Sequence, residues 1–288
     1  MKLIQTSTRI FFKITSLIAP AMAANIAFQL FQTTRKKVRS KERDFFQNST
    51  HFHVPGNQEN IDCYELGNPK GEIVFLVHGW ESNAGSMSAI AAKLASLNYR
   101  VIAFNFPAHG TSNLKKANLL VCSHAFLNVL GYIKPKDRFS VVGHSFGSAV
   151  SAYTLSKVDM QINKIMFLTT PNRISDIFSE FRKMIGLGES SYKLLLQKAQ
   201  ALLGEDPADV NVEDKMKMVK FSQLLILHDL FDKVLAHKNS LNVHKAISNS
   251  RMVTTFEVGH YRMLWDEKVL DQIEEYFSPG FVALPKAS

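Results

Sequence analysis

The sequence predicts an α/β protein with a mostly parallel central sheet that is covered by helices on both faces. Short apolar runs, typical of buried strands, alternate along the chain with longer stretches that repeat apolar residues at helical spacing. The chain has 288 residues, 46% of them hydrophobic, which is enough to bury one large core. Between Pro171 and Phe221 the alternation stops for roughly fifty residues, far more than one connecting helix needs, so we expect a helical insertion there.

The predicted elements alternate as a parallel sheet with crossover helices requires. The strand-like runs cover residues 71–77, 138–142, 165–170, 223–228 and 254–258, and the helical stretches cover 86–97, 117–132, 147–157, 237–248 and 264–277. Within the insertion, apolar residues recur at helical spacing over 174–181, and a second helix begins at Tyr192 and ends near Gly204. We therefore divide the chain into a basic leader (1–49), a core (50–171 and 222–288) and a helical cap insertion (172–221).

The segment Gly143-His144-Ser145-Phe146-Gly147 carries the strongest functional signal in the chain. It lies between a predicted strand and a predicted helix, which is the setting of a nucleophile elbow. The chain must reverse sharply there so that the serine oxygen stands clear of the backbone. A side chain at either glycine would collide with the neighbouring strand or helix. The segment therefore predicts that Ser145 is a nucleophile.

Three further segments supply the groups that such a serine needs. A His-Gly turn follows the first strand-like run, and we expect the backbone N–H of Trp80 in that turn, with the N–H of Phe146, to hold a developing oxyanion. Asp232 and His260 follow the last two strand-like runs. In this hypothesis His260 takes the proton of Ser145, and Asp232 orients His260 and stabilises its charged form.

These residues and their order resemble the α/β-hydrolase superfamily, from about residue 60 to the C-terminus. Residues 104–112 resemble its Asp-x-Pro-Gly-His-Gly-x-Ser loop, and Asn105 and Ala108 depart from that pattern in a structural loop. Residues 228–234 resemble its His-Gly-x-x-Asp-x-x-Val pattern, with Asp229 where glycine is usual. The resemblance implies a Ser-Asp-His triad and a cap over the active site.

The acid of the triad has two alternatives in the sequence. The spacing within residues 228–234 favours Asp232, but Asp229 lies in the same segment, and Asp176 follows the strand at which some hydrolases keep their acid. His144 is adjacent to the nucleophile, and we expect its side chain to point away into packing rather than to take part in catalysis.

No pattern in the sequence implies a metal or an organic cofactor. Cys63 and Cys122 lack the spacing of a disulfide framework or a zinc site, and no phosphate-binding glycine loop or His-Glu-x-x-His motif is found. The formal net charge is +9, but residues 1–43 hold nine Lys and Arg against the single acid Glu42, so the remainder is nearly neutral. A nucleic-acid partner is therefore not expected.

The basic leader allows three interpretations. A cleaved signal peptide would use Ala21-Met22-Ala23 as its cleavage site, but Arg9 and Lys13 interrupt the apolar run before it. A membrane span needs about 20 apolar residues, and the run at 14–31 is shorter and contains polar residues. The third interpretation is an amphipathic helical leader that docks on the protein or lies on a membrane surface, because polar and apolar residues gather on opposite sides.

The leader also resembles that of a group of bacterial α/β-hydrolases without signal peptides. The shared pattern is Pro20-x-x-Ala23-x-x-x-Ala27-Phe28-x-Leu30-Phe31 followed by a basic run. We therefore expect an attached leader on a cytoplasmic protein, with peripheral membrane contact as a further possibility. Export after signal-peptide cleavage is the alternative.

These observations predict that the protein is a serine hydrolase. The class they favour is a carboxylic ester hydrolase that works through an acyl-enzyme. Trp80 and the apolar residues of the insertion favour an uncharged small or acyl substrate. A thioesterase or an acyltransferase is the first alternative, because the triad does not choose the acceptor. A non-catalytic ligand-binding protein of the same fold is the second alternative.

Overall fold

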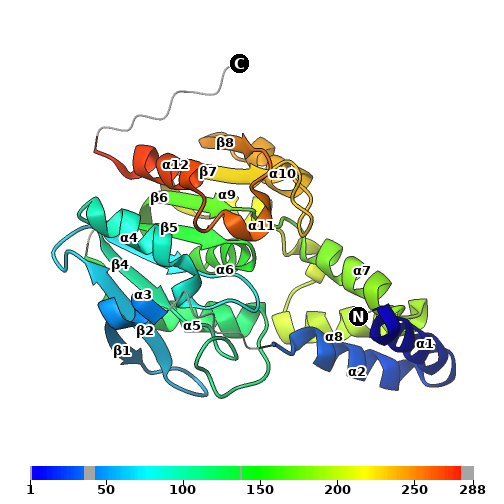
Figure 1. Cartoon of the computed structure of the whole chain (residues 1–288). Coiled ribbons are helices and arrows are strands. Elements are labelled where there is room, and N and C mark those ends of the chain that lie inside the picture. The colour runs from blue at the N-terminus through cyan, green and yellow to red at the C-terminus, as the bar shows by residue number, and fades with distance from the viewer. Residues whose placement is uncertain (1, 36–42, 137, 280–288) are drawn as a thin grey trace. The chain divides into compact units, whose positions relative to one another are not determined.

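The computed structural model describes residues 2–35, 43–136 and 138–279 (Figure 1). The chain forms two compact units. The helical unit consists of Met1–Thr33 and Arg173–Asn211, and the sheet unit consists of Thr34–Asn172 and Val212–Ser288. The sheet unit confirms the predicted fold class, because it contains an eight-stranded, mostly parallel sheet that is flanked by helices.

The strands cross the sheet in the order β1-β2-β4-β3-β5-β6-β7-β8. Their bounds are β1 (Thr50–Val54), β2 (Ile61–Gly67), β3 (Ile73–Val77), β4 (Arg100–Phe104), β5 (Phe139–His144), β6 (Gln161–Leu168), β7 (Lys220–Asp229) and β8 (Ser250–Thr255). β2 is antiparallel to β1 and to β4, and the other neighbouring pairs are parallel. The apolar runs do not predict β1, because it is an edge strand whose residues are mostly exposed.

Helices connect the strands of the sheet unit and cover the sheet. They are α3 (Arg43–Asn48), α4 (Ser88–Ser96), α5 (Leu119–Ile133), α6 (Phe146–Leu155), α9 (Val212–Lys217), α10 (Lys238–Ala246), α11 (Gly259–Arg262) and α12 (Glu267–Phe277). Local sequence sets several of the boundaries. The side chain of Asn118 accepts a hydrogen bond from the N–H of Val121, for example, and so caps the start of α5.

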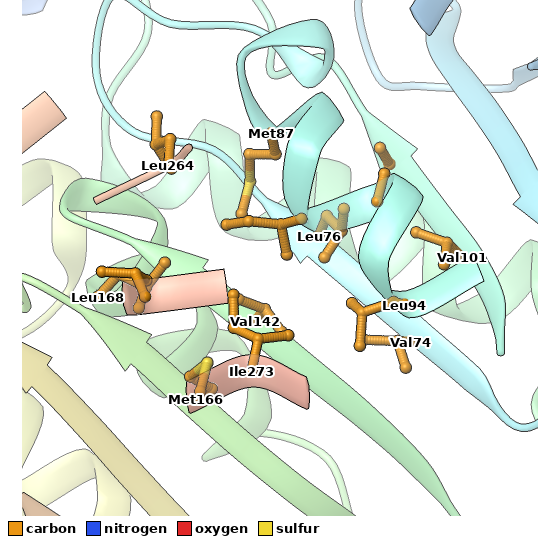
Figure 2. Close-up of a cluster of buried hydrophobic side chains, with 14 of the residues drawn as sticks. Val74, Leu76, Met87, Leu94, Val101, Val142, Met166, Leu168, Leu264 and Ile273 are labelled. Carbon is orange, nitrogen blue, oxygen red and sulfur yellow. The ribbon is translucent and has the colours of Figure 1, made fainter. Parts of the chain in front are cut away.

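Each face of the sheet buries its own apolar layer, since successive side chains of a strand point to opposite faces. On one face, Val74 and Leu76 of β3 pack with Leu94 of α4 and Ile273 of α12 (Figure 2). On the other face, the ring of Phe75 contacts the rings of Phe126 and Phe139, with centroids 5.7 Å and 5.4 Å away. Each such buried side chain contributes about 1.5–3 kcal/mol to folding.

The strand order reverses at β3, and this reversal predicts where a ligand binds. β4 lies on one side of β3, and β5 lies on the other side. In open α/β sheets, ligands bind beyond the carboxyl ends of the strands at such a switch point. Val77 at the end of β3 pairs with Gly143 near the end of β5, so the segments that contain Trp80 and Ser145 leave the sheet next to each other.

In the helical unit the leader and the insertion pack on each other. The leader forms α1 (Lys2–Ile18) and α2 (Pro20–Gln32), and the insertion forms α7 (Ile174–Ile185) and α8 (Glu189–Leu203). Phe12 of α1 lies in their shared core, and Phe31 of α2 stacks on Phe178 of α7 with ring centroids 4.5 Å apart. The small residues of α2 that face this core are fully buried: Ala23, Ala24 and Ala27.

The boundaries of the two units differ from the divisions that the sequence predicts. The leader at 1–49 is not a unit of its own: its first 33 residues share a core with the insertion, whereas α3 places Phe45 in the core of the sheet unit. The predicted insertion, 172–221, also extends beyond the helical unit, which contains only Arg173–Asn211 of it. The rest of the insertion, with α9, belongs to the sheet unit. The physical reason is long-range packing, which local patterns do not reveal. Among the residues that the structure describes, no helix combines the length and apolar content that crossing a membrane requires.

Truncation of Phe12 should destabilise the helical unit, and Phe11 provides a matched control on the same helix. Phe12 is 2% exposed, whereas Phe11 is 46% exposed. Replacing a buried phenylalanine with alanine costs about 3–5 kcal/mol, so Phe12→Ala should make the leader and the insertion sensitive to protease at lower denaturant concentration than Phe11→Ala. Limited proteolysis across a urea series measures this difference. Equal sensitivity of the two variants would contradict the packing described above.

Candidate active site

Ser145 lies in a sharp turn between β5 and α6. Its backbone angles, φ 53° and ψ −121°, lie outside the regions that most L-residues adopt. Two hydrogen bonds hold the turn: the N–H of Ser145 donates to the carbonyl of Leu168 at 2.8 Å, and the N–H of Ser148 donates to the carbonyl of Ser145 at 2.9 Å. Strained backbone of this kind persists only where the surrounding structure enforces it.

The two flanking glycines are required by close packing, as the sequence predicts. A Cβ atom on Gly147 would lie 2.1 Å from the carbonyl oxygen of Val77 in β3. A Cβ atom on Gly143 would lie 2.9 Å from the backbone of Ser148 in α6. Both distances are far below van der Waals contact with backbone atoms that cannot move aside. Hydrogen is therefore the only side chain that either position accepts.

His260 links Ser145 to Asp232. Its Nε2 lies 3.0 Å from Oγ of Ser145, and its Nδ1 lies 2.7 Å from Oδ2 of Asp232. The three side chains come from separate segments that follow β5, β7 and β8, all at the carboxyl edge of the parallel strands. The structure thus brings together the predicted nucleophile, base and acid in the hydrogen-bonding arrangement of a Ser-His-Asp relay.

Asp232 is a buried carboxylate with several hydrogen-bond donors. Its Oδ1 accepts from the N–H groups of Val234 and Leu235 at 2.7 Å and 3.0 Å. Burial alone would raise the pKa of this carboxyl, but hydrogen bonds from His228 and His260 outweigh the burial and hold the pKa of Asp232 well below its usual range. The carboxylate therefore stays ionised and can stabilise a charged imidazole.

Asp229, the first alternative acid, has a different set of partners. It is fully buried, and its carboxylate accepts hydrogen bonds from the N–H of Phe231 at 3.0 Å, the hydroxyl of Thr255 at 3.1 Å and the N–H of Val258 at 2.8 Å. These bonds join the loop after β7 to the segment that leads to His260. Asp229 thus fixes the distance between two loops of the site.

Asp176, the second alternative acid, lies in the first turn of α7 within the helical unit, and it is exposed. Of the three carboxylates that the sequence proposes as acid, Asp232 is the one whose hydrogen bond to His260 the structure records.

His228 belongs to the same network, although no sequence pattern described above assigns it a role. Its Nδ1 lies 2.6 Å from Oγ of Ser240, and its Nε2 lies 3.0 Å from the carbonyl oxygen of Leu235 and 3.4 Å from Oδ2 of Asp232. The signal for this role was in the chain, because His228 is the first residue of the segment that contains Asp232. Its hydrogen bonds position the acid.

The turn that carries Trp80 is oriented by His78. The N–H of Phe106 donates to Nε2 of His78 at 3.0 Å, so the ring proton sits on Nδ1, which lies 2.8 Å from the carbonyl oxygen of Gly79. Burial holds the pKa of His78 well below its usual value, which keeps this arrangement neutral. The Gly79 carbonyl is thereby fixed, and the N–H of Trp80, in the same trans peptide, points the opposite way.

His144 contacts the backbone of His260. Its Nε2 lies 3.0 Å from the backbone carbonyl oxygen of His260. Burial lowers the pKa of His144 to about 3, so the ring is neutral and Nε2 can donate to this carbonyl. The residue next to the nucleophile therefore fixes the backbone of the base, which agrees with the structural role that the sequence suggests.

The strained turn predicts that two substitutions that both remove the hydroxyl of Ser145 differ in their free energy of unfolding. Ser145→Gly should be more stable than Ser145→Ala by about 1 kcal/mol. Relief of a strained φ is worth about 1–3 kcal/mol, and the greater freedom of unfolded glycine takes back about 0.4–1 kcal/mol. Thermal and urea unfolding of the two variants measure the difference. An alanine variant as stable as the glycine variant would show that the turn carries no strain.

Comparisons with known proteins agree with this architecture. A family model described as alpha/beta hydrolase fold matches residues 72–188. A serine hydrolase-like protein from Danio rerio is 27% identical over 147 residues, which are 48% of this chain and 44% of that protein. The matched segment thus spans less than half the length of that relative.

Solved structures extend the likeness over most of the chain. An esterase from Pyrococcus furiosus superimposes with a TM-score of 0.65 at 17% sequence identity, covering 85% of this chain and 97% of the esterase. A bromoperoxidase from Bacillus anthracis does so with a TM-score of 0.58 at 19% identity, covering 77% of this chain and 97% of the bromoperoxidase. Together with the matching family model and the eight-stranded, mostly parallel sheet, these likenesses show that the chain has the α/β-hydrolase fold.

Proposed function

We propose that the chain is a serine hydrolase that cleaves carboxylic esters through an acyl-enzyme. The observation that carries this proposal is the continuous hydrogen-bonded series from Ser145 through His260 to Asp232, at 3.0 Å and 2.7 Å. The structural neighbour from Pyrococcus furiosus is an esterase, which supports the choice of ester chemistry. A protein that only bound a ligand would gain nothing from a strained serine aligned with a buried histidine and an ionised aspartate.

The proposed reaction follows from the positions of these atoms. Oγ of Ser145 attacks the ester carbonyl carbon while Nε2 of His260 takes the hydroxyl proton, and Asp232 stabilises the imidazolium. The tetrahedral intermediate expels the alcohol, which receives the proton from His260. Water, deprotonated by the same nitrogen, then attacks the acyl-enzyme and releases the acid, so that Ser145 regains its proton.

The oxyanion of each tetrahedral intermediate would be held by the N–H groups of Trp80 and Phe146. Phe146 is the first residue of α6, so its N–H has no acceptor within the helix and lies at the positive end of the helix dipole. The turn that leads to Trp80 passes beside Ser145, since a Cβ added to Gly79 would lie 3.4 Å from the Cβ of Ser145. One such donor typically accounts for about 10²–10³ in turnover.

Exposed apolar side chains near the acid and base support an uncharged substrate with an acyl or aromatic portion. They are Leu230, Phe231, Val234, Phe256, Tyr261 and Trp265, each at least 44% exposed. Phe178 and Leu195 of the insertion do not support this point, because both lie in the interior of the helical unit. We therefore expect an apolar substrate to contact the exposed side chains of the loops after β7 and β8.

A thioesterase or an acyltransferase on the same site is the alternative, because both reactions pass through the same acyl-enzyme. Product analysis distinguishes them from an esterase: a transferase forms a new ester from an added alcohol, and a thioesterase prefers a thioester over the matched oxygen ester.

The nucleophile can be tested with a fluorophosphonate probe and a series of p-nitrophenyl esters of graded acyl length. Wild type should be labelled on Ser145 and should hydrolyse the esters, whereas Ser145→Ala should lose labelling. Turnover in that variant should fall to the level that the oxyanion donors and binding alone sustain, roughly 10³–10⁴ above water. Labelling of Ser145→Ala at the wild-type rate would disprove the assignment. Labelling of wild type without turnover on any ester or thioester would favour the binding protein.

The two aspartates at the end of β7 should respond differently to replacement by asparagine. Asp232→Asn should lower turnover by roughly 10⁴, since the amide cannot stabilise a charged His260. Asp229→Asn should mainly lower stability, by about 1–3 kcal/mol, because three hydrogen-bond donors lose the charged acceptor that this fully buried side chain provides. Paired measurements of kcat and unfolding temperature separate the two effects. The reverse outcome would make Asp229 the acid.

The pH dependence of kcat/KM should show one ionisation on the acid side. Asp232 remains ionised down to low pH because its pKa lies well below the usual range, so the acid contributes no ionisation of its own near neutral pH. The logarithm of kcat/KM should then fall on the acid side with a limiting slope of about one, not two. A limiting slope of two would indicate that Asp232 titrates in the same range.

We also propose that the helical unit contacts an anionic membrane surface. Its leader helices expose large apolar side chains, namely Ile10, Phe11, Ile14, Leu17, Ile18 and Met22, with Leu17 85% exposed. Residues 1–33 contain Lys2, Arg9 and Lys13 and no acidic residue, which complements a negatively charged surface. Each basic residue near such a surface adds about 1 kcal/mol of attraction.

Sedimentation with vesicles tests this membrane contact. The full chain should bind vesicles that contain phosphatidylglycerol, bind pure phosphatidylcholine more weakly and be released by high salt. Leu17→Glu should abolish binding, whereas Met218→Glu, an equally charged change at an exposed residue of the sheet unit, should not. Absence of binding, or a leader face that instead pairs two copies in size-exclusion chromatography, would overturn the proposal.

A further inference from the structure

Two histidines and one aspartate meet on the ribbon formed by β1 and β2, away from the triad. His51 and His53 are two residues apart on β1, so both side chains lie on the same face of the strand. In the antiparallel pairing, His53 lies opposite Asp62 of β2, and His51 lies opposite Tyr64. Register alone therefore gathers two imidazoles and a carboxylate on one face of the ribbon.

The donor atoms of these side chains already converge on one point. Nε2 of His51 lies 2.9 Å from Oδ1 of Asp62, and Nδ1 of His53 lies 3.0 Å from the same oxygen. All three donor atoms lie within 4.8 Å of one another. Around a tetrahedral ion with bonds of about 2.0–2.1 Å, neighbouring ligand atoms are about 3.3 Å apart, so small side-chain rotations would admit the ion.

The surroundings hold two of the three ligands in place. The hydroxyl of Thr111 donates to Oδ2 of Asp62, which leaves Oδ1 directed at the histidines. The ring of His51 stacks on Tyr64 with centroids 4.9 Å apart. The His51 and His53 side chains are 44% and 56% exposed, so an ion can enter from solvent. A carboxylate oriented by an outer hydrogen bond is typical of metal sites.

We propose that His51, His53 and Asp62 form a binding site for Zn²⁺, with water completing the coordination. Two imidazole nitrogens favour zinc and related transition metals over Ca²⁺ and Mg²⁺, which prefer oxygen ligands. The ion joins β1, the edge strand, to β2 and so stabilises the outer end of the sheet. It takes no part in the reaction at Ser145, because β2, β4 and β3 lie between β1 and β5.

Titration of the full, untagged, chelator-treated chain with ZnCl₂ tests the site. Isothermal titration calorimetry should show one Zn²⁺ per chain, and zinc should raise the unfolding temperature until a chelator removes it. His51→Gln and His53→Gln should each weaken binding by at least about tenfold, and Thr111→Val should weaken it by a similar factor through the orientation of Asp62. His124→Gln, a change at an exposed histidine of α5, is the matched control and should bind as wild type does.

Two further measurements keep the proposal independent of folding and of the triad. His51 and His53 are exposed, so their glutamine variants should unfold at the wild-type temperature when zinc is absent. Ser145→Ala should bind zinc as wild type does, which separates this site from His260. The proposal is overturned if wild type shows no saturable binding, or if His53→Gln binds zinc as tightly as wild type.

Discussion

The close approach of α6 to the end of β3 is the constraint on which the site depends. Gly147 lies so near the carbonyl of Val77 that no side chain fits between them. This contact forces the chain between β5 and α6 into a turn that only a strained residue completes, and Ser145 takes the positive φ. The same contact brings the N–H of Phe146 close to the turn after β3. Backbone packing thus positions the proposed nucleophile and the proposed oxyanion donors, independently of the side chains of His260 and Asp232.

The base and the acid are then fixed relative to this turn by hydrogen bonds to the backbone. His144 precedes the nucleophile and bonds the carbonyl of His260, so the base is tied to the elbow itself. Asp229 bonds the N–H of Val258, two residues before that base, and thereby ties it to the loop of Asp232. Asp229 and Asp232 can both be buried because each accepts several hydrogen bonds. One of them holds the loops together, and the other faces the imidazole.

The sequence predicts the parts of the fold that local patterns determine. The strands β3, β5, β6 and β7 are predicted because they are buried apolar runs. The two glycines around Ser145 likewise predict a close backbone contact that leaves no room for a side chain. The sequence does not predict β1, because the exposed residues of this strand show no apolar pattern. It therefore does not predict that His51 and Asp62 lie side by side either. An amphipathic leader is visible in the sequence, but its partner is not. Packing of Phe12 and Phe31 against α7 and α8 joins residues that lie about 150 positions apart, and no spacing rule reports such a contact.

The segment that follows α2 makes long-range contacts of its own within the sheet unit. The N–H and the hydroxyl of Thr34 bond to the carbonyls of Lys115 and Ala108, and Arg35 forms a two-point ion pair with Glu81. Glu81 follows Trp80 directly and has a positive φ of 54°. The Glu81 carboxylate is therefore paired rather than only solvated. An exposed ion pair contributes at most about 1 kcal/mol, so the two backbone-directed bonds of Thr34 carry most of this attachment. The turn that carries Trp80 is thus contacted on one side by His78, through the carbonyl of Gly79, and on the other by Arg35, through the side chain of Glu81.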